Sequence, residues 1–317
     1  MILETLKGRS FLTLLDYSET EIRFLLDLAK QLKAGAKKGE GHQRFLGKTL
    51  AMIFEKRSTR TRCAFETAFG EEGGYPVFLS SADTQLGAKE SLEDTARVLG
   101  RMFSAIQFRG FKQSTVETLA EYSGVPVYNG LTDSFHPTQV LADIMTLEES
   151  FGDSAGKTLC FVGDGRNNVA RSLLVICSKL GINFRIITHP SLTPDPSLLG
   201  ICVSLAGTSG AEILVSSNIE DVKGAHALYT DVWASMGEEA VREERIRLLG
   251  PYQINQALMD RTGRRETIFL HCLPAIKEEE VTADVINGPQ SRVWDEAENR
   301  KHTIKAVMLA TLGCGEV

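Results

Sequence analysis

Short apolar runs alternate along the chain with longer segments in which apolar residues recur about once per helical turn. The runs predict β-strands, and the turn-spaced segments predict amphipathic helices. The nine expected strands cover residues 49–54, 76–79, 105–108, 125–128, 158–163, 184–188, 212–215, 227–230 and 267–271. Helical patterns lie between most of them. This β-α-β-α alternation occurs twice, without a detectable sequence repeat, and predicts an α/β protein of two doubly wound parallel-sheet domains.

The first and last helices show where we expect elements to end. Ser18 and Glu21 form a capping-box pattern ahead of the apolar-periodic run 22–32. The Lys- and Gly-rich segment 33–43 is expected to end that helix. Near the other end of the chain, residues 299–312 predict a strong helix with Arg300 near its start. A junction is expected at 152–156, so that one domain covers 1–150 and the next begins at 151.

Length and composition narrow the class of protein. The 317 residues suit two domains of ordinary size. A formal net charge of −6 disfavours nucleic-acid binding and leaves local basic clusters for a small anion. No window approaches the ~20 apolar residues that span a bilayer, and the start of the chain lacks a signal-sequence pattern. The six cysteines form no CxxC pair, so no metal site is indicated, and we expect a cytoplasmic location.

The segment Ser58–Arg62 follows the apolar run 49–54 and precedes a helical pattern. Its hydroxyl and guanidinium groups should therefore lie where a strand ends and a helix begins. The unpaired N–H groups and the positive dipole of a helix N-terminus favour a phosphate or another dianion there. A Ser or Thr cap beside surface arginines explains the same residues. This segment alone leaves both interpretations open.

Other polar residues follow strands in both halves of the chain. Ligands of doubly wound sheets bind beyond the carboxyl ends of the strands. Residues at or just after such ends therefore point to an active site in the cleft between the two domains. These residues are Arg60, Arg109, His136, Asn168, Asp231 and Cys272.

Each of these residues also has an ordinary structural explanation. Arg109 can be a surface residue, and Asn168 and Asp231 can cap helices. Together, however, the arginines would neutralise an anion, while His136 would donate a hydrogen bond to a carbonyl oxygen. Cys272 adjoins His271, but neighbouring strand residues point to opposite faces, which disfavours a nucleophilic pair. Asn168 also stands where a dinucleotide fingerprint requires its third glycine, which disfavours a nucleotide cofactor.

Two motifs in this order resemble the signature of the aspartate/ornithine carbamoyltransferase superfamily. They are Ser58–Arg62 and His136–Gln139. In the second half, Asp231–Gly237 resembles the ornithine-binding loop of the ornithine carbamoyltransferases, and His271–Pro274 is similar to the same branch. The resemblance covers nearly the whole chain.

The resemblance implies a role for each matching residue. The implied carbamoyl-phosphate ligands are Ser58, Thr59, Arg60, Thr61, Gln85, Arg109, His136, Gln139, Cys272, Leu273 and Arg300. The implied ornithine ligands are Asn168, Asp231, Ser235 and Met236. Catalysis would rest on Arg60, Arg109, His136 and Cys272. Gln85 would reach a neighbouring subunit's site, since the family forms trimers, and larger assemblies of trimers stay open.

The resemblance also implies a domain arrangement and a reaction. Residues 298–317 would pack back on the first, carbamoyl-phosphate-binding domain, leaving 151–297 as the ornithine-binding domain. The reaction would convert carbamoyl phosphate and L-ornithine into L-citrulline and phosphate, without a cofactor or a metal. The alternatives are a relative acting on putrescine or another amine, a non-catalytic binding homologue and a nucleotide-dependent oxidoreductase. The sequence leaves open whether the reaction makes or degrades arginine.

Overall fold

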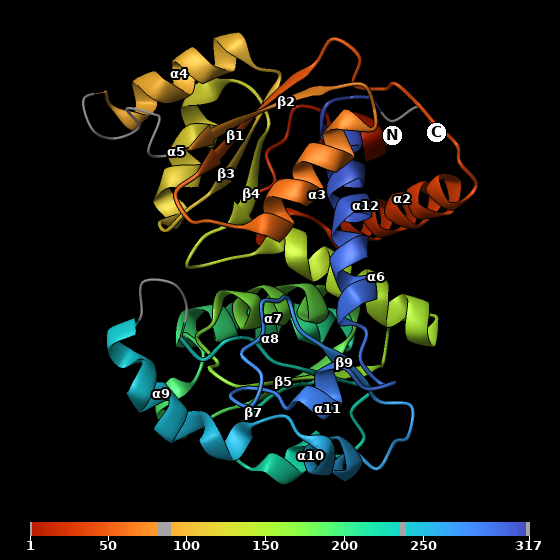
Figure 1. Ribbon diagram of the computed structural model, residues 1–317, viewed down its shortest axis with the longest axis vertical. Helices are drawn as coiled ribbons and strands as arrows, with labels where there is room; N and C mark the ends of the chain where they lie inside the picture. Colours follow the sequence, from red (N-terminus) through yellow and green to blue (C-terminus); the bar gives the residue numbers. More distant parts are fainter. Residues whose placement is uncertain (1, 81–89, 235–238, 315–317) are drawn as a thin grey trace. The chain divides into compact units, whose positions relative to one another are not determined.

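The computed structural model describes residues 2–80, 90–234 and 239–314 (Figure 1). The chain divides into two compact units. The first comprises Met1–Ala142 and Glu298–Val317, and the second comprises Asp143–Ala297. Both chain crossings between units fall within helices, namely α6 (Pro137–Phe151) and α12 (Val293–Thr311). The first crossing lies eight residues before the expected boundary at 150. Helix α6 continues without a break through both positions.

The first unit contains a four-stranded parallel sheet in the order β2-β1-β3-β4. Its strands are β1 (Thr49–Phe54), β2 (Tyr75–Ser80), β3 (Ala105–Arg109) and β4 (Val127–Leu131). Its helices before α6 are α1 (Ile2–Leu6), α2 (Glu19–Lys37), α3 (Thr59–Gly70), α4 (Leu92–Met102) and α5 (Gln113–Ser123). Alternate strand residues, including Ala51 and Ile106, pack against α4 and α5. Helix α3 covers the other face, where Phe65 lies against Tyr128 (Figure 1).

The second unit contains a five-stranded parallel sheet in the order β7-β6-β5-β8-β9. Its strands are β5 (Thr158–Val162), β6 (Asn183–Ile187), β7 (Ile213–Ser216), β8 (Ala227–Tyr229) and β9 (Ile268–Leu270). Its α-helices are α7 (Asn168–Leu180), α8 (Pro196–Ser209), α9 (Arg242–Leu249), α10 (Gln256–Arg261) and α11 (Ala283–Ile286). Helices α7 and α8 lie together on one face, and α10 and α11 lie on the other (Figure 1).

The α/β class and the two parallel sheets confirm the sequence prediction, and each expected strand is present. Strand ends shift by up to three residues, most at β4. Among the described helices, none has the length and apolar character needed to cross a membrane.

The predicted end of α2 is confirmed, whereas the predicted start of α12 is wrong. Helix α2 ends at Lys37, inside the Lys- and Gly-rich segment 33–43, and buried Lys33 donates a hydrogen bond to Asn299 Oδ1 at 2.6 Å. Helix α12 begins at Val293 rather than at 299, and the acidic residues of its first turn suit the helix dipole. Arg300 therefore lies in the interior of α12, not near its start.

Candidate active site

The start of α3 holds the Ser-Thr-Arg-Thr segment, which residues 55–57 connect to the end of β1. Ser58 caps the helix, and its hydroxyl accepts a hydrogen bond from the Thr61 N–H at 3.1 Å. The capping interpretation is therefore correct for Ser58. It is also compatible with anion binding, since a capping hydroxyl still carries a proton that it can donate. The next N–H groups, of Thr59 and Arg60, lie in the first turn, where the helix dipole is positive.

Two guanidinium groups converge on the hydroxyl of Thr61. Nη1 of Arg109, at the end of β3, and Nη2 of Arg300, from α12, each donate to Thr61 Oγ1 at 3.0 Å. Thr61 is fully buried, and Arg300 is nearly so. Three segments distant in sequence thus place two cations beside the start of α3. This arrangement suits a dianion, because guanidinium groups pair well with phosphate oxygens.

His136 lies buried beside this cationic group, directly before Pro137 at the start of α6. Burial lowers the pKa of His136 well below its usual value, and Arg300, Arg109 and Arg60 lower it further. The imidazole is therefore neutral near pH 7. A neutral imidazole can donate a hydrogen bond to a carbonyl oxygen while keeping its own proton. Gln139 is also buried, about one helical turn further along α6.

A second group of residues holds the loops around the cationic group. Lys56 Nζ lies 2.6 Å from Asp133 Oδ1 and above the ring of Phe111. The Glu55 carboxylate accepts a hydrogen bond from the Phe111 N–H at 3.1 Å. A Cβ atom on Gly110 would lie 2.2 Å from Glu55 Oε2 and 2.3 Å from Phe108 Cζ, so a larger residue here would require both side chains to shift. Sequence reasoning missed these roles, and the charged pair directly after an apolar strand was the available signal.

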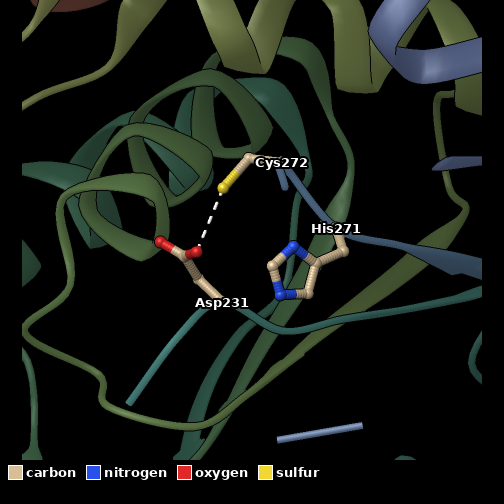
Figure 2. A group of neighbouring side chains, drawn as sticks. All are labelled: Asp231, His271 and Cys272. Atoms are coloured by element: carbon tan, nitrogen blue, oxygen red, sulfur yellow. Dashed lines mark hydrogen bonds between the residues drawn. The ribbon is translucent and has the colours of Figure 1, made fainter. Parts of the chain in front are cut away.

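Asp231, two residues after the end of β8, forms the centre of a cluster in the second unit. Its Oδ1 accepts hydrogen bonds from the Val232 N–H at 2.8 Å and from Cys272 Sγ at 3.1 Å (Figure 2). Its Oδ2 accepts one from Asn167 Nδ2 at 2.9 Å. Asn167 is the cap of α7, and Asn168 is the first residue of that helix. The structure therefore joins Asp231 directly to Cys272, as the strand-end argument predicts. The amide that contacts Asp231 is that of Asn167, one residue before the expected Asn168.

The Cys272 thiol is a hydrogen-bond donor in this cluster. Burial raises its pKa well above the usual value, and the neighbouring Asp231 carboxylate raises it further. A protonated thiol is a poor nucleophile. His271 does not activate it, because Nδ1 of His271 accepts from the Leu273 N–H at 2.8 Å and Nε2 lies 3.3 Å from Glu280 Oε1. The pair is thus not a Cys–His dyad.

Asp231, His271 and Cys272 also offer one potential metal ligand each, with those atoms within 4.8 Å of one another (Figure 2). A metal would have to remove the thiol proton, whose pKa is raised. It would also have to compete with the hydrogen bonds that Asp231 Oδ1 and the His271 ring accept. These contacts favour a hydrogen-bonded carboxylate–thiol pair over a metal site.

Further buried acids surround the Asp231 cluster. Glu296 accepts hydrogen bonds from the Tyr229 hydroxyl at 3.1 Å and from the His271 N–H at 3.0 Å. Burial raises the pKa of Glu296, although a hydrogen bond with Asp143 lowers it in part. Sequence reasoning missed Glu296 and Asp143, because nothing local marks a charged helix residue as buried.

Leu273 has a backbone conformation that non-glycine residues rarely adopt, with φ of 58°. The Leu273 N–H bond to His271 holds this turn in place. Such strained residues concentrate at functional sites.

The remaining expected ligands, Gln85, Ser235 and Met236, lie outside the described residues.

Comparison with known proteins defines the class first. Residues 9–149 match the carbamoyl-P binding domain of aspartate/ornithine carbamoyltransferase, and residues 155–311 match its Asp/Orn binding domain. The chain belongs to the aspartate/ornithine carbamoyltransferase family.

Individual relatives point to one branch of this family. The chain is 66% identical over 308 residues to an ornithine carbamoyltransferase from Caldanaerobacter subterraneus subsp. tengcongensis, covering 97% of this chain and 98% of the relative. It is 64% identical to an ornithine carbamoyltransferase from Pseudothermotoga lettingae, with the same coverage. The solved ornithine carbamoyltransferase from Pyrococcus furiosus superposes with a TM-score of 0.94 at 45% identity, covering 97% of this chain and 98% of that one.

Proposed function

We propose that this protein transfers the carbamoyl group of carbamoyl phosphate to the side-chain amine of L-ornithine, giving L-citrulline and phosphate. The observation that carries this proposal is the convergence of Arg109 and Arg300 on Thr61 beside a neutral His136. Guanidinium groups suit the phosphate, and the uncharged imidazole suits the carbamoyl oxygen. The 66% identity with an ornithine carbamoyltransferase selects the amine.

Carbamoyl phosphate is assigned to the first unit. Its phosphate binds at the start of α3 through Ser58, Thr59, Arg60 and Thr61, with Arg300 beside them. Arg109 bridges the phosphate and carbonyl oxygens, while His136 and Gln139 contact the carbamoyl group. Gln85 completes the site of a neighbouring subunit in the proposed homotrimer. We place this trimer in the cytoplasm, within arginine metabolism.

L-Ornithine is assigned to the second unit. Asp231 binds the α-ammonium group, because it is a carboxylate whose orientation three donors fix. Asn168, Ser235 and Met236 contact the amino-acid end of the substrate. Cys272 and Leu273 lie beside the reacting groups, where the protonated thiol acts as a hydrogen-bond donor rather than as a nucleophile.

The reaction proceeds by direct attack of the amine on the carbamoyl carbon. The amine must first lose a proton, since an alkyl ammonium group titrates near pKa ~10.4. The new C–N bond gives a tetrahedral intermediate, whose oxyanion Arg60, Arg109 and His136 stabilise. Cleavage of the C–O bond releases phosphate, which can accept the proton that the nitrogen loses. Placement and electrostatics supply most of the rate, without a covalent enzyme intermediate.

A citrulline assay with an amine panel tests this function. Purified protein receives carbamoyl phosphate and either L-ornithine, putrescine or N-acetyl-L-ornithine, and the products are identified by mass. We expect L-ornithine to give L-citrulline and an equal amount of phosphate, far faster than the other amines react. An enzyme-free reaction corrects for spontaneous breakdown of carbamoyl phosphate. Preferred turnover of putrescine, or binding of both substrates without turnover, would contradict the proposal.

A further inference from the structure

The side chain of Asn167 connects two elements of the second unit. Its Oδ1 caps α7 by accepting hydrogen bonds from the Val169 N–H at 2.7 Å and the Ala170 N–H at 3.4 Å. Its Nδ2 donates to Asp231 Oδ2 at 2.9 Å. Because the two helix N–H groups need an acceptor, the amide cannot be turned over. The NH₂ group therefore faces Asp231, and the assignment of oxygen and nitrogen follows from the network.

The Asp231 carboxylate depends on such partners for its orientation. The terminal torsion of an aspartate has a broad energy minimum, so the plane of the carboxylate is set by its hydrogen bonds. Val232 and Cys272 hold Oδ1, and Asn167 holds Oδ2. Donors on both oxygens fix the plane, whereas donors on Oδ1 alone leave the group free to rotate about it.

We infer that Asn167 is a positioning residue for the amino-acid substrate: it holds Asp231 in the orientation that receives the α-ammonium group. This inference rests on the proposed function, which assigns that ammonium group to Asp231. Asn167 thus has two roles on two atoms. Its oxygen stabilises the start of α7, and its nitrogen orients a carboxylate 64 positions further along the chain.

Two substitutions separate these roles. Asn167→Ser keeps a good helix cap, since a serine hydroxyl accepts from the same N–H groups, but it is too short to reach Asp231. Asn167→Ala removes both the cap and the donor. A residue that only capped α7 would tolerate Ser and not Ala. If Asn167 positions Asp231, both variants should lose substrate affinity equally.

The experiment measures KM for each substrate, together with the unfolding temperature. In both variants we expect KM for L-ornithine to rise by about tenfold, which is the low end for loss of a hydrogen bond to a charged group. KM for carbamoyl phosphate should not rise with it. Only Asn167→Ala should lower the unfolding temperature. The inhibition constant of 5-aminopentanoate, which has the reacting amine and the carboxylate but no α-ammonium group, should match that of the unsubstituted protein.

Asp231→Asn, measured in parallel, separates failure of this inference from failure of the proposed function. A raised KM for L-ornithine in Asp231→Asn but not in Asn167→Ser overturns the positioning role alone. An unchanged KM in Asp231→Asn overturns the ammonium site itself. Equal weakening of L-ornithine and 5-aminopentanoate by Asn167→Ser would also overturn the inference, because the effect would not depend on the α-ammonium group.

Discussion

The carboxyl edges of the two sheets carry opposite chemistry. The first unit gathers arginines around a threonine hydroxyl and lowers the pKa of His136. The second gathers buried acids, among them Asp231 and Glu296, and raises the pKa of Cys272. Both units use parallel strands that end in polar loops, so the architecture does not decide the ligand. The loops decide it, and the same fold can present a site for a dianion or for an ammonium group.

The largest effect should come from the cationic unit. Arg60→Ala removes a proposed transition-state contact and should lower kcat by about a thousandfold, as for the loss of an oxyanion donor. Arg57→Ala is the matched control, because Arg57 is exposed in the same loop. Steady-state kinetics measure both variants. Near-normal turnover of Arg60→Ala would remove the basis for placing carbamoyl phosphate at this helix start.

The acidic unit should respond through a different substrate. Asp231→Asn should raise KM for L-ornithine by about 10- to 100-fold, since it removes a charge-assisted contact, and should leave KM for carbamoyl phosphate nearly unchanged. The same substitution at exposed Asp260 of α10 serves as the control. An increase in KM for carbamoyl phosphate instead would show that the division of substrates between the two units is wrong.

Acid should lower the stability of the first unit through the buried side chain of His302. Burial and nearby lysines lower the pKa of buried His302 to about 4, below the ~6.5 of an unfolded chain. Below pH ~6.5 the unfolded chain therefore binds a proton that the folded chain does not, and stability falls as pH falls. At pH 5 this histidine alone should cost about 2 kcal/mol.

Denaturant unfolding at pH 7.5 and pH 5 measures this cost. The difference in unfolding free energy between the two pH values should shrink by about 2 kcal/mol in His302→Gln, which cannot take up the proton. If the substituted protein shows the same pH difference as the original, the low pKa of His302 does not contribute to acid sensitivity.

The smallest effect is expected at Cys272. Cys272→Ser keeps a hydrogen-bond donor beside Asp231, so kcat should fall by less than about tenfold, whereas loss of a true nucleophile costs several orders of magnitude. Steady-state turnover and a search for a carbamoylated protein by intact mass test this together. A covalent adduct on the unsubstituted protein, absent from the variant, would restore the nucleophilic interpretation.

Much of the fold follows from local patterns in the sequence. Apolar runs of strand length mark each β-strand, and parallel strands bring their carboxyl ends to one edge. This geometry is why Arg109 and the start of α3 could be expected to lie together. It also explains why Asp231 and Cys272 meet, although they are 41 positions apart.

Long-range polar contacts could not be predicted in the same way. Arg300 reaches Thr61 from the interior of α12, across 239 positions. Lys56 and Asp133 are separated by 77 positions, and nothing in either local sequence indicates the other. Asn167 and Asn168 are adjacent and identical, so the sequence does not show which of them caps α7 and contacts Asp231. Such contacts depend on tertiary packing rather than on periodicity.

Gly110 has a consequence for how this chain can vary. It contributes no side chain, yet the Glu55 carboxylate and the Phe108 ring lie where its Cβ would be. Any larger residue would displace Glu55, Phe108 or the turn that follows Arg109. This position should therefore accept a replacement only where those neighbours can shift. The absence of a side chain at Gly110 is thus itself a structural requirement of the turn that follows β3.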